Sequence, residues 1–190
     1  MSKALKFILT TSWILFSRGY DVYATYQHTP DLEKEANPLA SVLGFGWSPI
    51  LLIVSLLTLF IIYNYYIATF KPYNLLPQEK GLSFEQVTTY IYFGKSDKWA
   101  ALLYKMPKNV KRLQHYLGHI LTYAISFAGI ISTIMWLLIR HTDFYKNYHS
   151  AAAIYVIIIL GIIGINIYWH RKMYKTYQLQ TEQSYTTTTI

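Results

Sequence analysis

Long stretches without a charged residue alternate with polar segments along this chain. The uncharged runs cover Leu39–Phe70, Ile120–Ile139 and Ser150–Trp169. A helix of about 20 apolar residues crosses a bilayer core about 30 Å thick, and each run is long enough to provide one. The pattern therefore predicts an all-α integral membrane protein. Membrane spans are expected at about 49–68, 112–139 and 150–169.

The N-terminal segment predicts a further span. Two lysines precede the apolar stretch Phe7–Phe16, as basic and apolar regions do in a signal peptide. No small-x-small cleavage site follows, and apolar residues resume after the charged pair Arg18 and Asp21. We interpret residues 4–26 as a retained span. The expected architecture is one domain, residues 1–177, formed by a bundle of four transmembrane helices.

Helix-start signals predict short helices in the loops. Asn37 followed by Pro38 provides an N-cap residue and a proline at the first helical position. This pair favours a short interfacial helix after the first loop, over residues 39–45. Ser83 and Gln86 have the spacing of a capping box, which predicts a second helix start in the longest polar loop.

That loop, residues 71–111, is expected to lie on the cytoplasmic membrane surface. Its apolar positions recur at helical spacing and predict amphipathic helices at about 83–93 and 97–104. Tryptophan and lysine side chains on such helices favour the headgroup region of a bilayer. The Thr-rich tail, residues 178–190, is polar throughout and is predicted to be disordered.

The distribution of basic residues predicts how the spans are oriented. Charged residues make up only 14% of the chain, and the net charge is +8. Eight of the lysine and arginine residues lie between Lys71 and Arg112, whereas the other two loops carry few. The positive-inside rule therefore places this loop and both termini in the cytoplasm. Because the basic residues flank spans, we attribute the net charge to membrane topology and expect no nucleic-acid partner.

The expected partners are the lipid bilayer and, for a packing role, other membrane subunits or a second copy of the chain. Lysine outnumbers arginine thirteen to four, which is typical of an AT-rich bacterial genome. We therefore expect an integral protein of the bacterial inner membrane.

Arg18 and Asp21 form a charged pair inside the first predicted span. They are three residues apart, so they share one face of a helix. Ionisable groups at membrane depth usually face the interior of a bundle or water. The pair is either a proton, ion or polar-ligand site, or an ion pair that holds two helices together.

Histidine residues are the candidate metal ligands. His28 lies in the first predicted outer loop and His141 and His149 in the second, while His115 and His119 are four apart on one face of the third span. Imidazole groups brought together in this way bind zinc or another divalent ion. The chain has no cysteine and no H-E-x-x-H motif, so we expect no cofactor, and interfacial or capping roles explain the histidines equally well.

A signature surrounds the first loop. It consists of Asp21-x-x-x-Thr25, Thr29-Pro30-Asp31-Leu32, Glu35-Ala36-Asn37-Pro38-Leu39 and Leu43-Gly44-Phe45-Gly46-Trp47. It resembles the N-terminal signature of uncharacterised bacterial integral membrane proteins, over about thirty of the 190 residues. The resemblance implies no activity. It implies that Asp21, Thr25, Glu35 and Asn37 are the functional positions. Together with Arg18, one turn before Asp21, they form the predicted binding or polar cluster.

Three classes of function fit these patterns. The first is a binding, accessory or scaffold subunit that acts by helix packing in a membrane assembly. The second is a small oligomeric transporter or channel with Arg18 and Asp21 along a polar path. The third is a membrane-embedded enzyme that acts on a lipid or lipid-linked substrate, with Asp21 and Glu35 as the candidate catalytic residues. No catalytic motif decides whether the chain is an enzyme.

Overall fold

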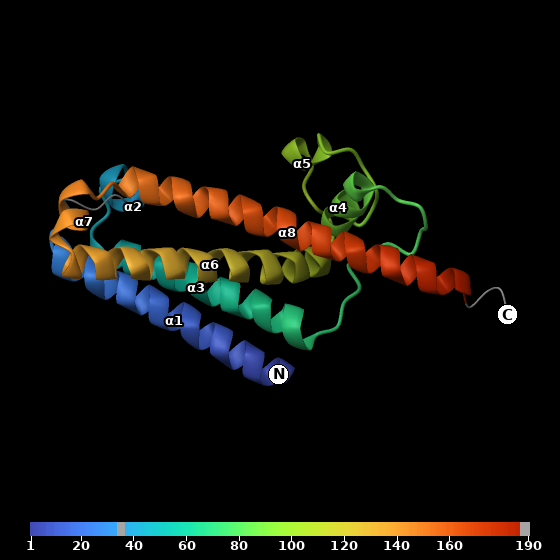
Figure 1. Cartoon of the computed structure of the whole chain (residues 1–190), viewed down its shortest axis with the longest axis horizontal. Helices are drawn as coiled ribbons and strands as arrows, with labels where there is room; N and C mark the ends of the chain where they lie inside the picture. Colours follow the sequence, from blue (N-terminus) through green and yellow to red (C-terminus); the bar gives the residue numbers. More distant parts are fainter. Residues whose placement is uncertain (34–36, 187–190) are drawn as a thin grey trace. The chain divides into compact units, whose positions relative to one another are not determined.

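The fold is all-helical in the part of the chain that the structure describes. This computed structural model describes residues 1–33 and 37–186, and these residues contain helices and no strand (Figure 1). The helices are α1 (Lys3–His28), α2 (Pro38–Ser41), α3 (Trp47–Phe70), α4 (Phe84–Phe93), α5 (Ala101–Tyr104), α6 (Val110–His141), α7 (Asp143–Tyr148) and α8 (Ala151–Thr186). The prediction of an all-α chain is confirmed.

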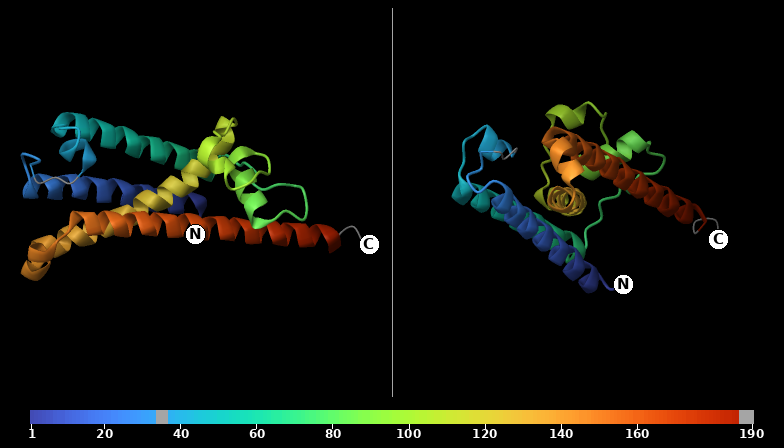
Figure 2. Two further views of the ribbon diagram at one scale, coloured as in Figure 1. Left: turned by 90° about the horizontal axis from the view of Figure 1, so that it is seen from above. Right: turned by 60° about the vertical axis from the view of Figure 1, so that its left-hand side comes forward.

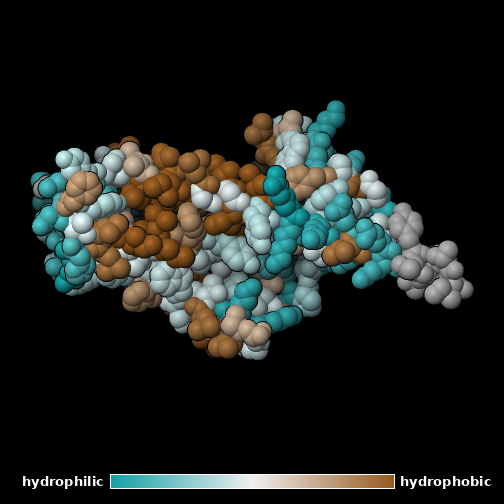
Figure 3. Space-filling model, viewed as in Figure 1, coloured by the Kyte–Doolittle hydropathy of each residue, from teal (hydrophilic) through white to brown (hydrophobic). Residues whose placement is uncertain are grey.

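Three of the described helices, α3, α6 and α8, are long and apolar enough to cross a membrane. They contain nearly all of the predicted spans 49–68, 112–139 and 150–169. Large apolar side chains on these helices are exposed, among them Leu52, Leu59 and Leu160. Figure 3 shows such side chains gathered over the first half of α8. Apolar side chains exposed along whole helices suit contact with lipid, so the helices indicate an integral membrane protein.

The contacts within the chain form two compact units. Unit 1 consists of Met1–Tyr63 and Leu121–Ile162, and unit 2 consists of Asn64–Ile120 and Ile163–Ile190. The residue ranges of α3, α6 and α8 each extend over both units. The single domain expected from chain length stays a prediction.

In unit 1, α1 and α6 pack side by side and run parallel. The indole Nε1 of Trp13 donates to the carbonyl of Ser126 at 3.2 Å. Further along both helices, the Ser132 hydroxyl donates to the carboxylate of Asp21. Between these contacts, Gly129 lets the two helices approach closely. A Cβ placed on Gly129 would lie 2.5 Å from the Oγ of Ser17, which is fully buried. Because the residue numbers rise together on both helices, the two run in the same direction.

Unit 2 has its own hydrophobic core. Its buried members come from the segment before α4, from α4 itself, and from α6 and α8: Leu75, Leu76, Val87, Ile91, Ile120, Trp169 and Tyr177. The predicted capping box is confirmed, since the Ser83 hydroxyl accepts from the Gln86 N–H and the Gln86 side chain accepts from the Ser83 N–H. Gly94 ends α4 with a φ of 80°, in the left-handed region that glycine adopts freely.

Residues 83–93 were expected to place their apolar face on the membrane surface. This is wrong, because that face is buried in the protein. Val87 and Ile91 of α4 are completely buried, and α4 lies against α8 in both views (Figures 1 and 2). An amphipathic helix buries its apolar face against whichever apolar surface is available, and here that surface is protein.

Arg112 joins three parts of unit 2. Its Nη1 donates to the carbonyl oxygens of Leu75 and Tyr90, at 2.9 and 3.0 Å. The guanidinium also lies over the rings of Tyr73 and Tyr90, 5.6 and 4.8 Å from their centroids. The side chain is only 6% exposed, and the described residues place no carboxylate within ion-pair distance. The carbonyl oxygens at the C-terminal end of α4 and the aromatic faces stabilise this buried cation.

The ends of several elements differ from the expectation. The helix expected at 97–104 is confined to α5, because a side-chain network at Asp97 holds the residues before it in a turn. The predicted loop after α6 contains α7. The tail expected to be disordered from 178 continues α8 to Thr186, and within it the Thr181 hydroxyl donates to the Tyr177 carbonyl at 2.7 Å. Leucine, glutamine and glutamate are good helix formers and allow this extension.

Gly118→Ala should destabilise unit 2. A Cβ at Gly118 would clash with the carbonyl oxygen of Asn64 and lie 2.7 Å from the Cβ of Ala68 on α3. The backbone of α3 or α6 would have to move, which costs about 1–3 kcal/mol. Thermal unfolding in detergent tests this.

Gly164→Ala is the matched control, since nothing lies within 4 Å of its added Cβ. Equal melting temperatures for the two variants would contradict the close approach at Gly118.

Candidate functional site

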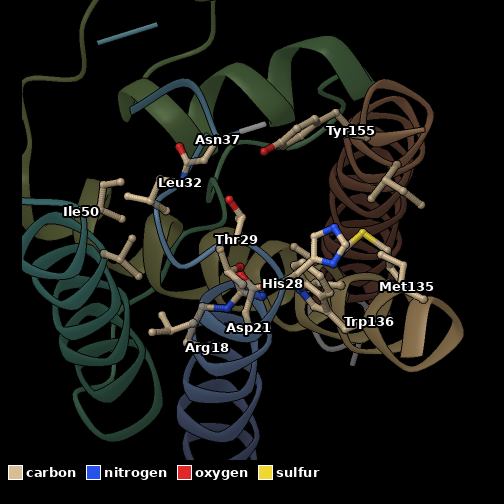
Figure 4. Close-up of a pocket in the computed structure, with 18 of the residues that line it drawn as sticks. Arg18, Asp21, His28, Thr29, Leu32, Asn37, Ile50, Met135, Trp136 and Tyr155 are labelled. Carbon is tan, nitrogen blue, oxygen red and sulfur yellow. Dashed lines mark hydrogen bonds and ion pairs between the residues drawn. The ribbon is translucent and has the colours of Figure 1, made fainter. Parts of the chain in front are cut away.

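Unit 1 encloses a pocket of about 580 Å³ between α1, α3, α6 and α8. Figure 4 shows side chains from these helices and from the first loop directed into it. Its polar lining residues are Arg18, Asp21, Thr25, His28, Thr29, Asn37, Trp47, Ser132, Trp136, His149 and Tyr155. Its apolar wall includes Ile50, Val54, Ile139, Ile154 and Ile158. The pocket therefore combines a polar group of side chains with an aliphatic wall.

Asp21 is held by α6. Its Oδ1 accepts from the indole Nε1 of Trp136 at 2.9 Å and from the hydroxyl of Ser132 in a short hydrogen bond. Its Oδ2 lies 3.6 Å from Nη1 of Arg18, so the predicted pair forms. Three donors thus surround the carboxylate.

Arg18 is less well satisfied than Asp21. Its Nε and Nη2 are buried, and neither has a hydrogen-bond partner among the described residues. A guanidinium offers five N–H donors in a fixed plane, and burying them without acceptors costs free energy. Arg18 also lines the pocket, so its side chain contributes a cationic group to the pocket wall.

The first loop closes one side of the pocket. The Thr29 hydroxyl donates to Asp31 Oδ1 at 3.0 Å, and the same oxygen accepts from the Glu33 N–H at 3.1 Å. Between them Leu32 has a φ of 64°, in the left-handed region that a leucine rarely adopts. Leu32 also lines the pocket. The loop thus keeps a large apolar side chain against the cavity in a strained backbone conformation.

Asn37 lies at the end of the first loop and caps α2. Its Oδ1 accepts from the Leu39 N–H at 3.0 Å, which confirms the predicted cap. The indole of Trp47 donates to the Pro30 carbonyl at 2.7 Å and so ties the start of α3 to the loop. The structure therefore brings Arg18, Asp21, Thr25 and Asn37 to one pocket. Glu35, the other candidate catalytic residue, lies outside the described residues.

The candidate metal ligands do not form one site. His28 and His149 both line the pocket, whereas His115 stacks on Tyr73 and His119 contacts Trp169 in unit 2. His141 is exposed at the end of α6. Within residues 1–33 and 37–186, no three His, Cys, Asp or Glu side chains are grouped so as to hold a metal ion.

His149 is one of the two histidines that line the pocket. Burial, together with the nearby His28 ring, lowers the pKa of His149 below its usual value. Its neutral ring therefore persists to a lower pH than that of a solvated histidine. Its Nδ1 is buried without a hydrogen-bond partner in the described part of the chain. The ring can donate to or accept from a molecule in the pocket.

Several pocket residues were not singled out from the sequence. Ser132 and Trp136 bind Asp21, and Tyr155 points toward the loop side of the cavity in Figure 4. All three lie in uncharged runs that gave no signal beyond membrane spans. A smaller cavity of about 450 Å³ lies within unit 2, with aromatic walls that include Tyr92, Tyr116 and His170.

The described residues form a helical protein with three helices apolar enough to span a membrane and a pocket lined by both polar and aliphatic side chains. Comparison of the chain with protein-family models, with curated proteins and with solved structures finds no match in any of the three. The resemblance of residues 20–47 to uncharacterised bacterial membrane proteins therefore stays a prediction.

Asp21→Leu should lower thermal stability in detergent, while Asp21→Asn should unfold near the wild-type temperature. Asparagine keeps an oxygen that accepts from Trp136 and Ser132, whereas leucine leaves these donors and Arg18 without an acceptor. Such a loss costs about 1–3 kcal/mol.

Asp143→Leu is the control for loss of an acidic residue, because Asp143 is exposed on α7. If Asp21→Leu melts with the wild type, the contacts of Asp21 do not hold α1 against α6.

Proposed function

We propose that this protein is a binding or accessory protein of the membrane whose pocket in unit 1 holds an amphiphilic molecule. The observation that carries the proposal is the composition of the pocket lining. Arg18 and His149, each with a buried side-chain nitrogen that lacks a hydrogen-bond partner among the described residues, line the same cavity as an aliphatic wall. Hydrogen-bonding groups fix the orientation of a ligand, and apolar walls bury the rest of it. A lipid or a lipid-linked compound has both parts.

The state of Asp21 favours binding over catalysis. Both carboxylate oxygens are already engaged, by α6 on one side and by Arg18 on the other. A general acid or base needs an oxygen that reaches the substrate. Asp21 instead positions Arg18 at the pocket, and its contacts to α6 keep the two helices together.

A membrane-embedded enzyme that acts on a lipid-linked substrate is the second candidate. The observation that favours it is the Nδ1 of His149, which lines the pocket without a partner among the described residues. A neutral imidazole at this position suits proton transfer. Turnover that His149→Gln abolishes while ligand binding persists would replace the first proposal by this one.

We further propose that α1 is a fourth span and that both termini are cytoplasmic in a bacterial inner membrane. Its 26 residues have a length of about 39 Å, enough for a bilayer core. The contacts from Trp13 to Asp21 run beside residues 126–136 of α6, which lie inside a candidate span. Exposed apolar side chains such as Ile8, Leu15 and Phe16 suit the lipid. The loop rich in lysine supports the orientation.

Ala151→Trp should abolish retention of the bound amphiphile. Ala151 lines the pocket, so an indole there occupies part of the cavity and excludes a ligand tail. Native mass spectrometry of protein extracted from membranes in a mild detergent should show lipid-sized adducts on the wild type and not on this variant.

Ala152→Trp is the matched control. Ala152 is the next residue of α8, is exposed and does not line the pocket. Adducts that survive in both variants would mean that the lipid is bound elsewhere, and the pocket would then have no part in binding.

Reporter fusions test the topology. Reporters placed after residues 35, 90, 145 and 185 should read outside, inside, outside and inside, because basic loops stay on the cytoplasmic side. A cytoplasmic signal at 35 or at 145 would overturn this orientation.

A further inference from the structure

The segment between α4 and α6 exposes several large apolar side chains. Leu103 is 90% exposed, Met106 80% and Tyr104 71%. Trp99 and Val110, at the two ends of the segment, are also exposed. We call Trp99, Leu103, Tyr104, Met106 and Val110 the 99–110 patch.

Specific contacts fix the patch in place. The Thr89 hydroxyl of α4 donates to the Asp97 carbonyl and accepts from the Asp97 N–H, both at 2.9 Å. The Trp99 N–H donates to Glu85 Oε1 at 2.6 Å, and Ala101 is 1% exposed against the rest of unit 2. The turn is thus anchored to α4, near which α5 lies in Figure 1, while Leu103 and Met106 stay exposed.

Lysines surround the patch. Lys95, Lys98, Lys108 and Lys111 are all exposed. The only acidic residue between 95 and 111 is Asp97, and its Oδ2 already accepts from Nζ of Lys105 at 2.5 Å. The positive charge of the other lysines is therefore not neutralised within the segment.

We propose that the 99–110 patch is a contact surface for anionic lipid headgroups. The interfacial side chains of tryptophan and tyrosine sit at the level of the headgroups, while leucine and methionine insert among the upper acyl carbons. Juxtamembrane lysines attract acidic lipids such as phosphatidylglycerol. The patch also ends at Val110, the first residue of α6, so a candidate span continues directly from it.

This role lies in unit 2 and is independent of the ligand pocket. It also explains why the sequence suggested a membrane-surface helix in this loop. The expected surface contact is made by the turn after α4, because α4 itself buries its apolar face in protein.

A single labelled thiol tests the proposal in the full-length chain. Because the chain has no cysteine, Met106→Cys carries a fluorophore at that site alone. The protein is placed in nanodiscs of phosphatidylcholine, or of equal parts phosphatidylcholine and phosphatidylglycerol, each with lipids that carry a spin-label quencher on the headgroup. We expect strong quenching in the anionic discs, weaker quenching in the neutral discs, and a loss of this difference at high salt.

Matched variants separate the lipid from other partners. The same label at Gln78→Cys, an exposed site of unit 2 outside the patch, should stay accessible to a water-soluble quencher in both discs. Neutralising Lys98, Lys108 and Lys111 to Gln should lower the headgroup-contact equilibrium by roughly fivefold per lysine.

Water-like accessibility of the Met106→Cys label in both discs would overturn the proposal. Equal shielding in both discs would overturn its anionic preference. Shielding that appears only when copies are crowded in lipid-free detergent would identify a protein partner instead.

Discussion

The hydrogen bonds from α6 to the Asp21 carboxylate are the interaction on which unit 1 depends. A carboxylate in an apolar helix is costly unless donors surround it, and here a hydroxyl, an indole and a guanidinium do so. The same contacts fix the rotation of α1 against α6 and turn Arg18 toward the pocket. The Asp21 carboxylate therefore sets the register between two otherwise apolar helices.

Unit 2 handles its buried charge in a different way. Arg112 has no carboxylate partner in the described part of the chain and instead uses backbone carbonyls and tyrosine faces. Carbonyls at the end of a helix carry partial negative charge, so they stabilise a cation without adding an ionisable group. Arg112 consequently connects α4 and the 75–76 segment to the start of α6.

Local signals in the sequence were sufficient for the caps, whereas the partners of Asp21 needed the structure. The Asn37 cap and the Ser83–Gln86 box each depend on a few neighbouring residues, and both are confirmed. Ser132 and Trp136 lie in an uncharged run in which every helix face is apolar, so no periodicity marks the face that meets α1. Amphipathicity likewise identified α4, but it does not distinguish a lipid surface from a protein surface. Predicting the pocket would require both local signals and the contacts between residues far apart in the sequence.

The distance along the chain between Asp21 and its partner Ser132 has a consequence for biosynthesis. The two residues are 111 positions apart, so the ribosome completes α1 about 5–20 s before α6 exists, at roughly 5–20 residues per second. During that interval the Asp21 carboxylate lacks its hydroxyl and indole donors. Arg18, one turn away, is already present, so the contact between these two side chains can form within α1 itself. The pair thus precedes the pocket and becomes part of it only when α6 is present.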